Sequence, residues 1–306
     1  MTEPAQPATR PHALKAISPA RDRLQSRLLV TLTAPAVAAS ILFGLLATGD
    51  QGGRYQITAV SLLFAAIAAF MRSATVSGAV CGALVCFCMT WWTRDLERPL
   101  PHSALPPLLC LFILTFAATR AGRKQKQARG LAERSSGRTA AQVMANLGVA
   151  ALIVTPVGAY TAALAGLTLP IDPLVLATAC LAALAEATAD TVSSEIGQAF
   201  GEKTYMLTSL RRVHRGTDGG VSVLGTSAGA AAALLVVLVG IWSLRLSAPA
   251  TAIAFSAAII GFVADSLLGA TLERRGWIGN NIVNLASTAI AAFAVFPLAR
   301  LITITR

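Results

Sequence analysis

The sequence predicts an all-α protein, a polytopic transmembrane helical bundle of about nine spans. Hydrophobic residues make up 55% of the 306 residues and charged residues only 13%, about half of the roughly 25% that is usual in soluble domains. The mean hydropathy is +0.66, and apolar runs of about 20 residues, long enough to cross a bilayer, follow one another along most of the chain. Abundant alanine and glycine allow helices to approach closely, so we expect a compact bundle.

The first expected span follows a basic tail. Residues 1–26 are rich in proline, alanine and arginine without apolar periodicity, and we expect a disordered tail ahead of one transmembrane catalytic domain at 27–306. The run 28–48 is longer than the core of a signal peptide, so we interpret it as a retained helix. The further expected spans are 55–71, 73–92, 105–119, 140–163, 171–192, 222–243, 249–272 and 280–299.

The basic residues predict the orientation of these spans. Cytoplasmic loops of membrane proteins are enriched in lysine and arginine. With the N-terminus inside and the C-terminus outside, all but six of the 25 basic residues fall on the cytoplasmic side. We therefore expect this topology, in a bacterial inner membrane, and the net charge of +11 needs no nucleic acid partner to explain it. The six residues expected outside are Arg54, Arg94, Arg98, Arg245, Arg300 and Arg306.

Cysteine and histidine do not indicate a zinc site or a disulfide framework. The five cysteines all lie in apolar runs without a CxxC pair, and the three histidines are scattered along the chain. Free cysteine is among the most buried residue types, so we expect these cysteines to be packing residues.

Three carboxylates interrupt the apolar character of the chain after residue 185. Glu186 and Asp190 are four residues apart and share a helix face, whereas Glu195 lies on another face. A charge near the bilayer centre costs about 2.5–3.5 kcal/mol, so such residues usually face a cavity and serve a function. Asp190 and Glu195 are expected near the cytoplasmic surface, where carboxylates hold Mg²⁺ beside a substrate phosphate.

A second polar stretch, GRTAAQVMAN, begins at residue 137. Arg138, Gln142 and Asn146 are spaced four apart and line one face of the helix that enters the membrane. Hydrogen bonding between helices explains such a face as well as ligand binding does. Arg138 and Asn146 are therefore candidates for binding the substrate, with a structural role as the alternative.

A third stretch, RRVHRGTDGGVSVLGTSAG, combines arginines with a glycine-rich turn at residues 211–229. Glycines let backbone N–H groups converge on an anion, a following helix N-terminus favours negative charge, and arginines add bidentate phosphate contacts. The pattern GxxxxGK[ST] is absent, so this is not a Walker A loop. A helix is expected from about residue 221. The candidate phosphate-binding residues are Arg211, Arg212, Gly216, Thr217, Gly219 and Gly220.

A fourth stretch runs from residue 261 to residue 284. Asp265 lies inside an apolar run, and Asn281 and Asn284 follow after a short basic turn. An acidic residue inside a membrane span is a functional-site hypothesis, with a structural pairing to asparagine or arginine as the alternative. We expect Asp265 to face the same cavity as Asp190.

Together these stretches predict phosphoryl transfer on a lipid substrate. Catalysis of this reaction consists mainly of positioning and charge neutralisation, and carboxylate-bound Mg²⁺ with a phosphate-binding turn supplies both. The expected catalytic residues and Mg²⁺ ligands are Asp190, Glu195 and Asp265. The remaining candidates for the nucleotide site, besides the arginine and glycine-turn residues at 211–220, are Arg138, Asn146, Asn281 and Asn284.

The four motifs, in this order, resemble those of a membrane-protein family that includes the plant and cyanobacterial phytyl-phosphate kinases and the animal transmembrane protein nineteen. The resemblance covers roughly residues 60–300 and implies transfer of phosphate from CTP, or another nucleoside triphosphate, to an isoprenyl monophosphate. The stretch ADTVSSEIGQAFGEK is similar, more distantly, to part of the dolichol and phytol kinases and CDP-lipid synthases, which use CTP and Mg²⁺.

Matched position by position, the resemblance assigns the acidic motif to Asp190 and Glu195, and the C-terminal motif to Asp265 and Asn281. It assigns the glycine turn to the four residues already named at 216–220. Arg215 and Asp218 stand where many relatives carry proline and asparagine, a departure that bears on substrate choice. Two other functions use similar residues: a CTP:lipid-phosphate cytidylyltransferase, and an ion-coupled transporter with intramembrane carboxylates.

Overall fold

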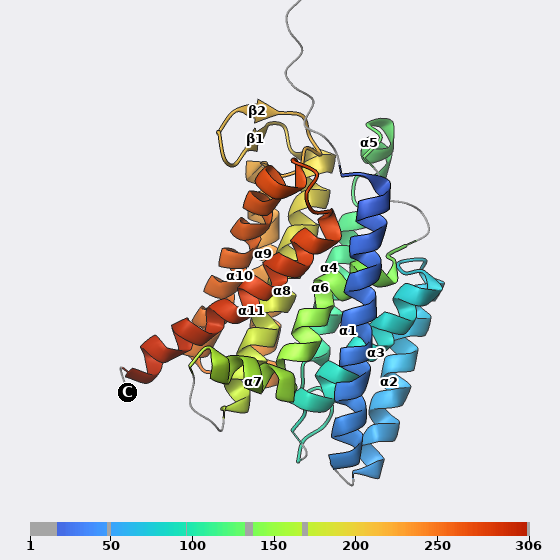
Figure 1. The fold of residues 1–306 in the computed structure, drawn as a ribbon, viewed down its shortest axis with the longest axis vertical. Helices are drawn as coiled ribbons and strands as arrows, with labels where there is room; N and C mark the ends of the chain where they lie inside the picture. The colour runs from blue at the N-terminus through green and yellow to red at the C-terminus, as the bar shows by residue number, and fades with distance from the viewer. Residues whose placement is uncertain (1–16, 48–49, 96, 132–136, 167–170, 305–306) are drawn as a thin grey trace, which may run out of the picture.

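The computed structural model describes residues 17–47, 50–95, 97–131, 137–166 and 171–304. The described chain forms a bundle of long helices with a small sheet and a short helix, α5, at one end (Figure 1). The elements are α1 (Pro19–Ala47), α2 (Gln51–Phe70), α3 (Val76–Thr93), α4 (Leu105–Arg120), α5 (Arg123–Ala128), α6 (Ala140–Ile153), α7 (Pro156–Leu164), α8 (Pro173–Phe200), β1 (Thr204–Met206), β2 (Arg212–Val213), β3 (Gly220–Val221), α9 (Val223–Leu244), α10 (Ala248–Leu268), the π-helical turn η1 (Gly269–Glu273) and α11 (Asn280–Ile304).

The helical bundle agrees with the predicted fold class, but its number of membrane spans differs from the expected nine. Within the described residues, seven helices are long and apolar enough to cross a membrane, and a bent pair, α6 with α7, raises the number to eight. The pair bends by 77° because Pro156 follows the extended, helix-capping Thr155. Helix α4 has only 16 residues and is shorter than a full span.

Helix α8 lies at the centre of the bundle, where it packs against α4, α6, α9, α10 and α11. Alanine is the commonest residue at its buried positions, and α9 approaches it through glycines. A Cβ atom at Gly229 would lie 2.6 Å from the carbonyl oxygen of Ala189, so glycine is needed at this crossing. The acidic residues of α8 are thus carried into the interior rather than toward lipid.

The segment between α8 and α9 forms a three-stranded antiparallel sheet that the sequence reading did not predict. Strand β1 pairs with β2 on one side and with β3 on the other. Helix α9 begins at Val223 with Ser222 as its N-cap, two residues later than expected. The sheet lies at the same end of the bundle as α5 (Figure 1). The predicted phosphate-binding turn connects β2 to β3 and therefore lies at this end too.

The first helix begins and the last helix ends on opposite sides of the bundle. Helix α1 begins at Pro19, so the helix starts before the expected boundary at residue 27, and residues 1–16 lie outside the described residues. Its N-terminal end lies beside the sheet, whereas α11 ends at the far side (Figure 1). Termini on opposite sides are what an N-in, C-out topology requires; which end faces the cytoplasm stays a prediction.

Candidate functional site

Asp190 of α8 and Asp265 of α10 lie side by side inside the bundle. Both residues are half-buried, and their carboxyl groups are within hydrogen-bonding reach of each other. Oδ1 of Asp265 is buried without a hydrogen-bond partner in the described part of the chain. Two adjacent carboxylates repel each other unless a cation or a proton lies between them. The pair therefore requires either a shared proton or a bound cation.

Two further carboxylates surround this pair. Glu186, one turn deeper on α8, is 1% exposed, and neither carboxylate oxygen has a hydrogen-bond partner among the described residues. It packs against Gly261 of α10, where a Cβ atom would lie 2.8 Å from its Cγ. Glu273 of η1 lies close enough to Asp190 for their charges to interact. We call Glu186, Asp190, Asp265 and Glu273 the acidic cluster.

The acidic cluster fits a divalent cation that is held partly by substrate. In the described residues, no three Asp, Glu, His or Cys side chains converge closely enough to hold a metal on their own. Mg²⁺ in phosphate-transfer sites is usually bound by one or two carboxylates together with substrate phosphates and water. Asp190 and Asp265 supply two such carboxylates, and the buried, unpartnered oxygen of Asp265 is a suitable ligand.

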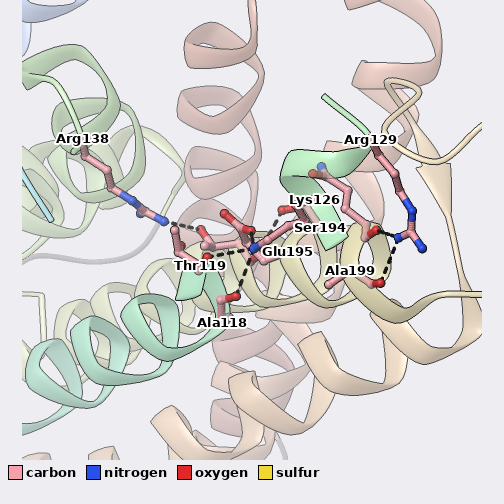
Figure 2. A network of polar contacts seen from close by, with 10 residues as sticks. Ala118, Thr119, Lys126, Arg129, Arg138, Ser194, Glu195 and Ala199 are labelled. Carbon is pink, nitrogen blue, oxygen red and sulfur yellow. Dashed lines mark hydrogen bonds and ion pairs between the residues drawn. The ribbon is translucent and has the colours of Figure 1, made fainter. Parts of the chain in front are cut away.

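Glu195 was expected to be the third metal ligand, but the structure places its carboxylate on Lys126 of α5 (Figure 2). The ammonium group of Lys126 is 1% exposed and also donates to the carbonyl oxygens of Thr119, at 2.9 Å, and Ala118, at 3.4 Å. These carbonyls end α4, where a positive charge is favourable. The geometry thus corrects the expected set: Glu195 joins α5 and α4 to α8.

Arg138 approaches α8 one turn before Lys126 does, at Thr191 rather than Glu195 (Figure 2). Its guanidinium donates to the hydroxyl of Thr191 at 3.5 Å and is near enough to Asp190 for their charges to attract. Its backbone is fixed to the end of α2 by two hydrogen bonds, one to the carbonyl of Ser73 at 2.9 Å and one from the N–H of Thr75 at 3.0 Å. A predicted site residue is therefore held next to the acidic cluster by rigid backbone contacts.

The predicted asparagines bind other helices rather than the acidic cluster. Nδ2 of Asn284 donates to Oδ1 of Asn146 at 3.2 Å, and Nδ2 of Asn146 donates to the carbonyl of Gln142. Nδ2 of Asn281 donates to the hydroxyl of Ser26 at 2.9 Å. For these three residues the structural alternative, hydrogen bonding between helices, describes the observed contacts.

The glycine turn at 216–220 packs directly on η1, next to the acidic cluster. Gly219 has a φ of +70°, and a Cβ atom there would lie 2.2 Å from the backbone nitrogen of Ala270. Thr217 and Gly220 have their N–H groups bound within the turn, to the carbonyls of His214 and Thr217. This fixes the shape of the turn but removes these two N–H groups from phosphate binding.

Charged side chains extend from the sheet and turn toward solvent. Arg211, which directly precedes β2, and Arg212, its first residue, are exposed and are called the arginines of β2 below; their guanidinium groups are accessible to a soluble ligand. Loss of hydration beside η1 raises the pKa of Asp218 above its usual value, and the nearby charge of Arg274 opposes that rise. Glu273 and Lys126 were not singled out from the sequence, because both lie in segments that resemble ordinary charged loops.

Replacing Gly219 tests whether the turn must lie against η1. We expect Gly219→Ala to lower the melting temperature and to raise the KM for nucleotide at least about fivefold, because the methyl group displaces the turn from Ala270. Gly130→Ala is the matched control, since Gly130 has a similar φ of +69° with no atom within 4 Å of the added Cβ. Each variant incurs the left-handed backbone strain of about 1–2 kcal/mol. Equal kinetics in the two variants would contradict a role for this contact.

Comparison with known proteins places these motifs in a family. Residues 59–292, about three quarters of the chain, match the family model described as integral membrane protein DUF92. An uncharacterized membrane protein of Synechocystis sp. is 36% identical over 190 residues, which are 60% of this chain and 69% of that protein. The chloroplast protein VTE6 of Arabidopsis thaliana is 28% identical over 184 residues, which are 59% of this chain and 54% of the plant protein.

The similarity extends to archaea. An uncharacterized membrane protein of Methanocaldococcus jannaschii is 33% identical over 187 residues, 60% of this chain and 71% of that protein. No solved structure matches the chain. The family match includes all four polar motifs and confirms the resemblance seen in them. The chain therefore belongs to the integral membrane protein family DUF92.

Proposed function

We propose that the protein is a membrane-embedded kinase that transfers a phosphate from CTP to an isoprenyl monophosphate, forming the diphosphate. The observation that carries the proposal is the proximity of the Asp190 and Asp265 carboxyl groups beside a glycine turn that packs on η1. The resemblance of the four motifs to the phytyl-phosphate kinase family supports the choice of reaction. In this reaction a phosphate oxygen of the lipid attacks the γ-phosphorus, the bond to the β–γ bridging oxygen breaks, and the nucleoside diphosphate leaves.

Each part of the site has a role in the proposed reaction. Asp190 and Asp265 would hold Mg²⁺, which when bound neutralises charge on the transferred phosphoryl group. The turn and the arginines of β2 bind the phosphates of the nucleotide at the membrane surface. Arg138 attracts the acceptor phosphate toward the acidic pair. Little covalent chemistry is required of the protein, because positioning and electrostatics supply most of the catalysis.

Labelled CTP distinguishes the proposed kinase from the other two functions. Purified protein is incubated with phytyl monophosphate, Mg²⁺ and CTP labelled at either the α- or the γ-phosphate. We expect label in the lipid from the γ-position only. Label from the α-position would identify a cytidylyltransferase instead, and absence of label from both positions, with every nucleoside triphosphate, would exclude both transfer reactions.

The arginines of β2 are expected to contribute to binding rather than to the chemical step. We expect Arg211→Ala and Arg212→Ala each to raise the KM for CTP about three- to tenfold with little change in kcat, because contacts made equally in ground and transition states affect KM. Arg275→Ala is the control, since Arg275 is an exposed arginine that lies after η1 and stacks 5.5 Å from the ring centroid of Trp277. Wild-type kinetics in both β2 variants would leave these arginines with a role in membrane orientation alone.

A further inference from the structure

A cavity of about 330 Å³ lies between α2, α3, α4, α6 and α8, and the glycine turn at 216–220 does not line it. Helix α8 contributes Ala187 to its wall, and the residues of the acidic cluster do not line it. Its volume is within the range of roughly 300–1,000 Å³ that is usual for small-molecule sites. The residues at 211–220 that are proposed to bind the nucleotide phosphates do not line this cavity.

One end of the cavity is strongly basic. Five cationic residues line it and no carboxylate is among its described lining residues. The cations come from chain positions far apart, at the end of α2, the end of α4, α5 and the start of α6. The Arg120 guanidinium is held by the carbonyl of Met71 at 3.0 Å and lies 4.2 Å from the ring centroid of Phe116. We call these residues the basic rim: Arg72, Arg120, Arg123, Lys126 and Arg138.

The rest of the cavity is mainly apolar, with Thr115, Gln142 and Asn146 among its polar lining residues, and it runs along helices of the bundle away from the basic rim. On α4 the lining runs from Arg120 to Leu108, twelve residues earlier, which corresponds to about 18 Å along the helix axis. Further walls come from the membrane-embedded turns of α2, α3 and α6. The apolar lining includes Phe64, Leu108, Leu111, Phe112, Phe116 and Leu147. A ligand that fills this space must carry an anionic group at one end and a narrow hydrocarbon chain behind it.

The basic rim connects the cavity to the acidic cluster through Arg138. The Arg138 side chain lines the cavity, donates to Thr191 of α8, and attracts Asp190. Its backbone is held by the hydrogen bonds with Ser73 and Thr75 and packs closely on α3, where a Cβ atom at Gly78 would lie 2.2 Å from the Arg138 carbonyl oxygen. Lys126 is already neutralised by Glu195, so the remaining rim arginines supply the unpaired positive charge.

We infer that this cavity binds the phosphate monoester of a single-chain lipid, with the chain among the apolar side chains and the phosphate at the basic rim. Arginine suits a phosphate because its planar group forms bidentate contacts. A volume of about 330 Å³ favours one chain over two. The identification of this lipid as the acceptor rests on the proposed kinase function. The acceptor would then reach the acidic cluster from within the membrane, and the nucleotide from the side of the sheet.

Equilibrium binding without nucleotide tests the inference independently of transfer. The purified full-length protein in detergent is titrated with phytyl monophosphate, phytol, inorganic phosphate and dioleoyl phosphatidate, with intrinsic tryptophan fluorescence or native mass spectrometry as the readout. We expect phytyl monophosphate to bind at least tenfold more tightly than the other three. Equal binding of phytol, or of the two-chain phosphatidate, would overturn the inference.

Two pairs of variants locate the bound lipid. Arg138→Gln should weaken binding of phytyl monophosphate about tenfold, the usual consequence of losing one charge-assisted contact, whereas Arg129→Gln, outside the cavity and bound to the carbonyls of Gln198 and Ala199, should not. Gly82→Leu fills the cavity and should weaken binding at least tenfold. The neighbouring Ala83→Leu, which faces a separate apolar groove between α2 and α3, should have little effect.

The outcomes separate the two proposals. Selective binding of phytyl monophosphate that is weakened in Arg138→Gln and Gly82→Leu, without transfer from any nucleoside triphosphate, would support the lipid site and refute the kinase. Transfer activity with binding that is unchanged in both Arg138→Gln and Gly82→Leu would refute the lipid site and leave the kinase standing. If Gly82→Leu fails to fold, the arginine pair and the comparison of phytyl monophosphate with phytol still decide the question.

Discussion

Asp190→Asn is expected to lower kcat/KM for phosphate transfer by at least about 100-fold while the protein remains inserted and folded. The amide keeps the size of the side chain but loses the negative charge that would hold Mg²⁺ against the substrate phosphates. Asp265→Asn should have an effect of similar size, because its carboxyl group contacts that of Asp190. Kinetics are measured as a function of Mg²⁺ concentration, with melting temperature as the measure of folding.

The double variant and a control on the same helix make this test specific. Groups that act as a unit have non-additive effects. The double variant Asp190→Asn/Asp265→Asn should therefore lower kcat/KM little more than either single change does. Asp172→Asn is the control: Asp172 is the N-cap of α8 at the other end of the helix and accepts from the N–H of Leu174 at 2.8 Å. Asparagine caps helices as well as aspartate does, so this variant should be fully active. Full activity of Asp190→Asn at low Mg²⁺ would remove Asp190 from the metal site.

Glu195→Gln is expected to destabilise the protein by about 3 kcal/mol, because it leaves the buried ammonium of Lys126 without its counter-charge. If Glu195 were instead a metal ligand, as the sequence suggested, the variant would lose activity at unchanged stability. Denaturation of the detergent-solubilised protein, monitored by loss of helical circular dichroism, separates these outcomes.

An exposed ion pair provides the comparison for this buried one. Arg98 and Asp95 form a salt bridge at 3.0 Å with side chains that are 41% and 42% exposed. Asp95→Asn should therefore cost less than about 1 kcal/mol. The combined change Lys126→Met with Glu195→Leu should recover most of the stability lost in Glu195→Gln, since an apolar pair needs no counter-charge. Stability equal to wild type in Glu195→Gln would show that the pair is not a structural link.

The sequence was most informative where a polar residue conflicts with its surroundings. Asp190 and Asp265 stand out because each interrupts an apolar run, and that conflict is visible without any knowledge of packing. The order of the helices follows from the length of the apolar runs. Pro156 also indicates a break after α6, because proline cannot continue a regular helix, whereas the length of the apolar run 140–163 alone predicts one span.

Contacts between segments far apart in the chain could not be predicted from the sequence in this way. Lys126 and Lys124 look alike in the basic loop, yet Lys126 is 1% exposed and Lys124 lies on the surface. Asn281 and Asn284 are three residues apart, but one binds Ser26 and the other Asn146. Helix spacing tells which residues share a face, not which helix lies opposite, and that partner is decided by packing of the whole bundle.

The π-helical turn η1 also determines how the surface loop is oriented relative to the intramembrane acids. A π turn closes its hydrogen bonds one residue later than an α turn, so it is equivalent to a single residue inserted into a regular helix. Gly269–Glu273 lies between Asp265 and the basic loop, and it carries both the surface that receives Gly219 and the carboxylate of Glu273. Gain or loss of one codon here would rotate everything beyond it relative to Asp265 and leave the helix core before it intact. The position of the surface loop relative to Asp265 therefore depends on the one additional residue that η1 accommodates.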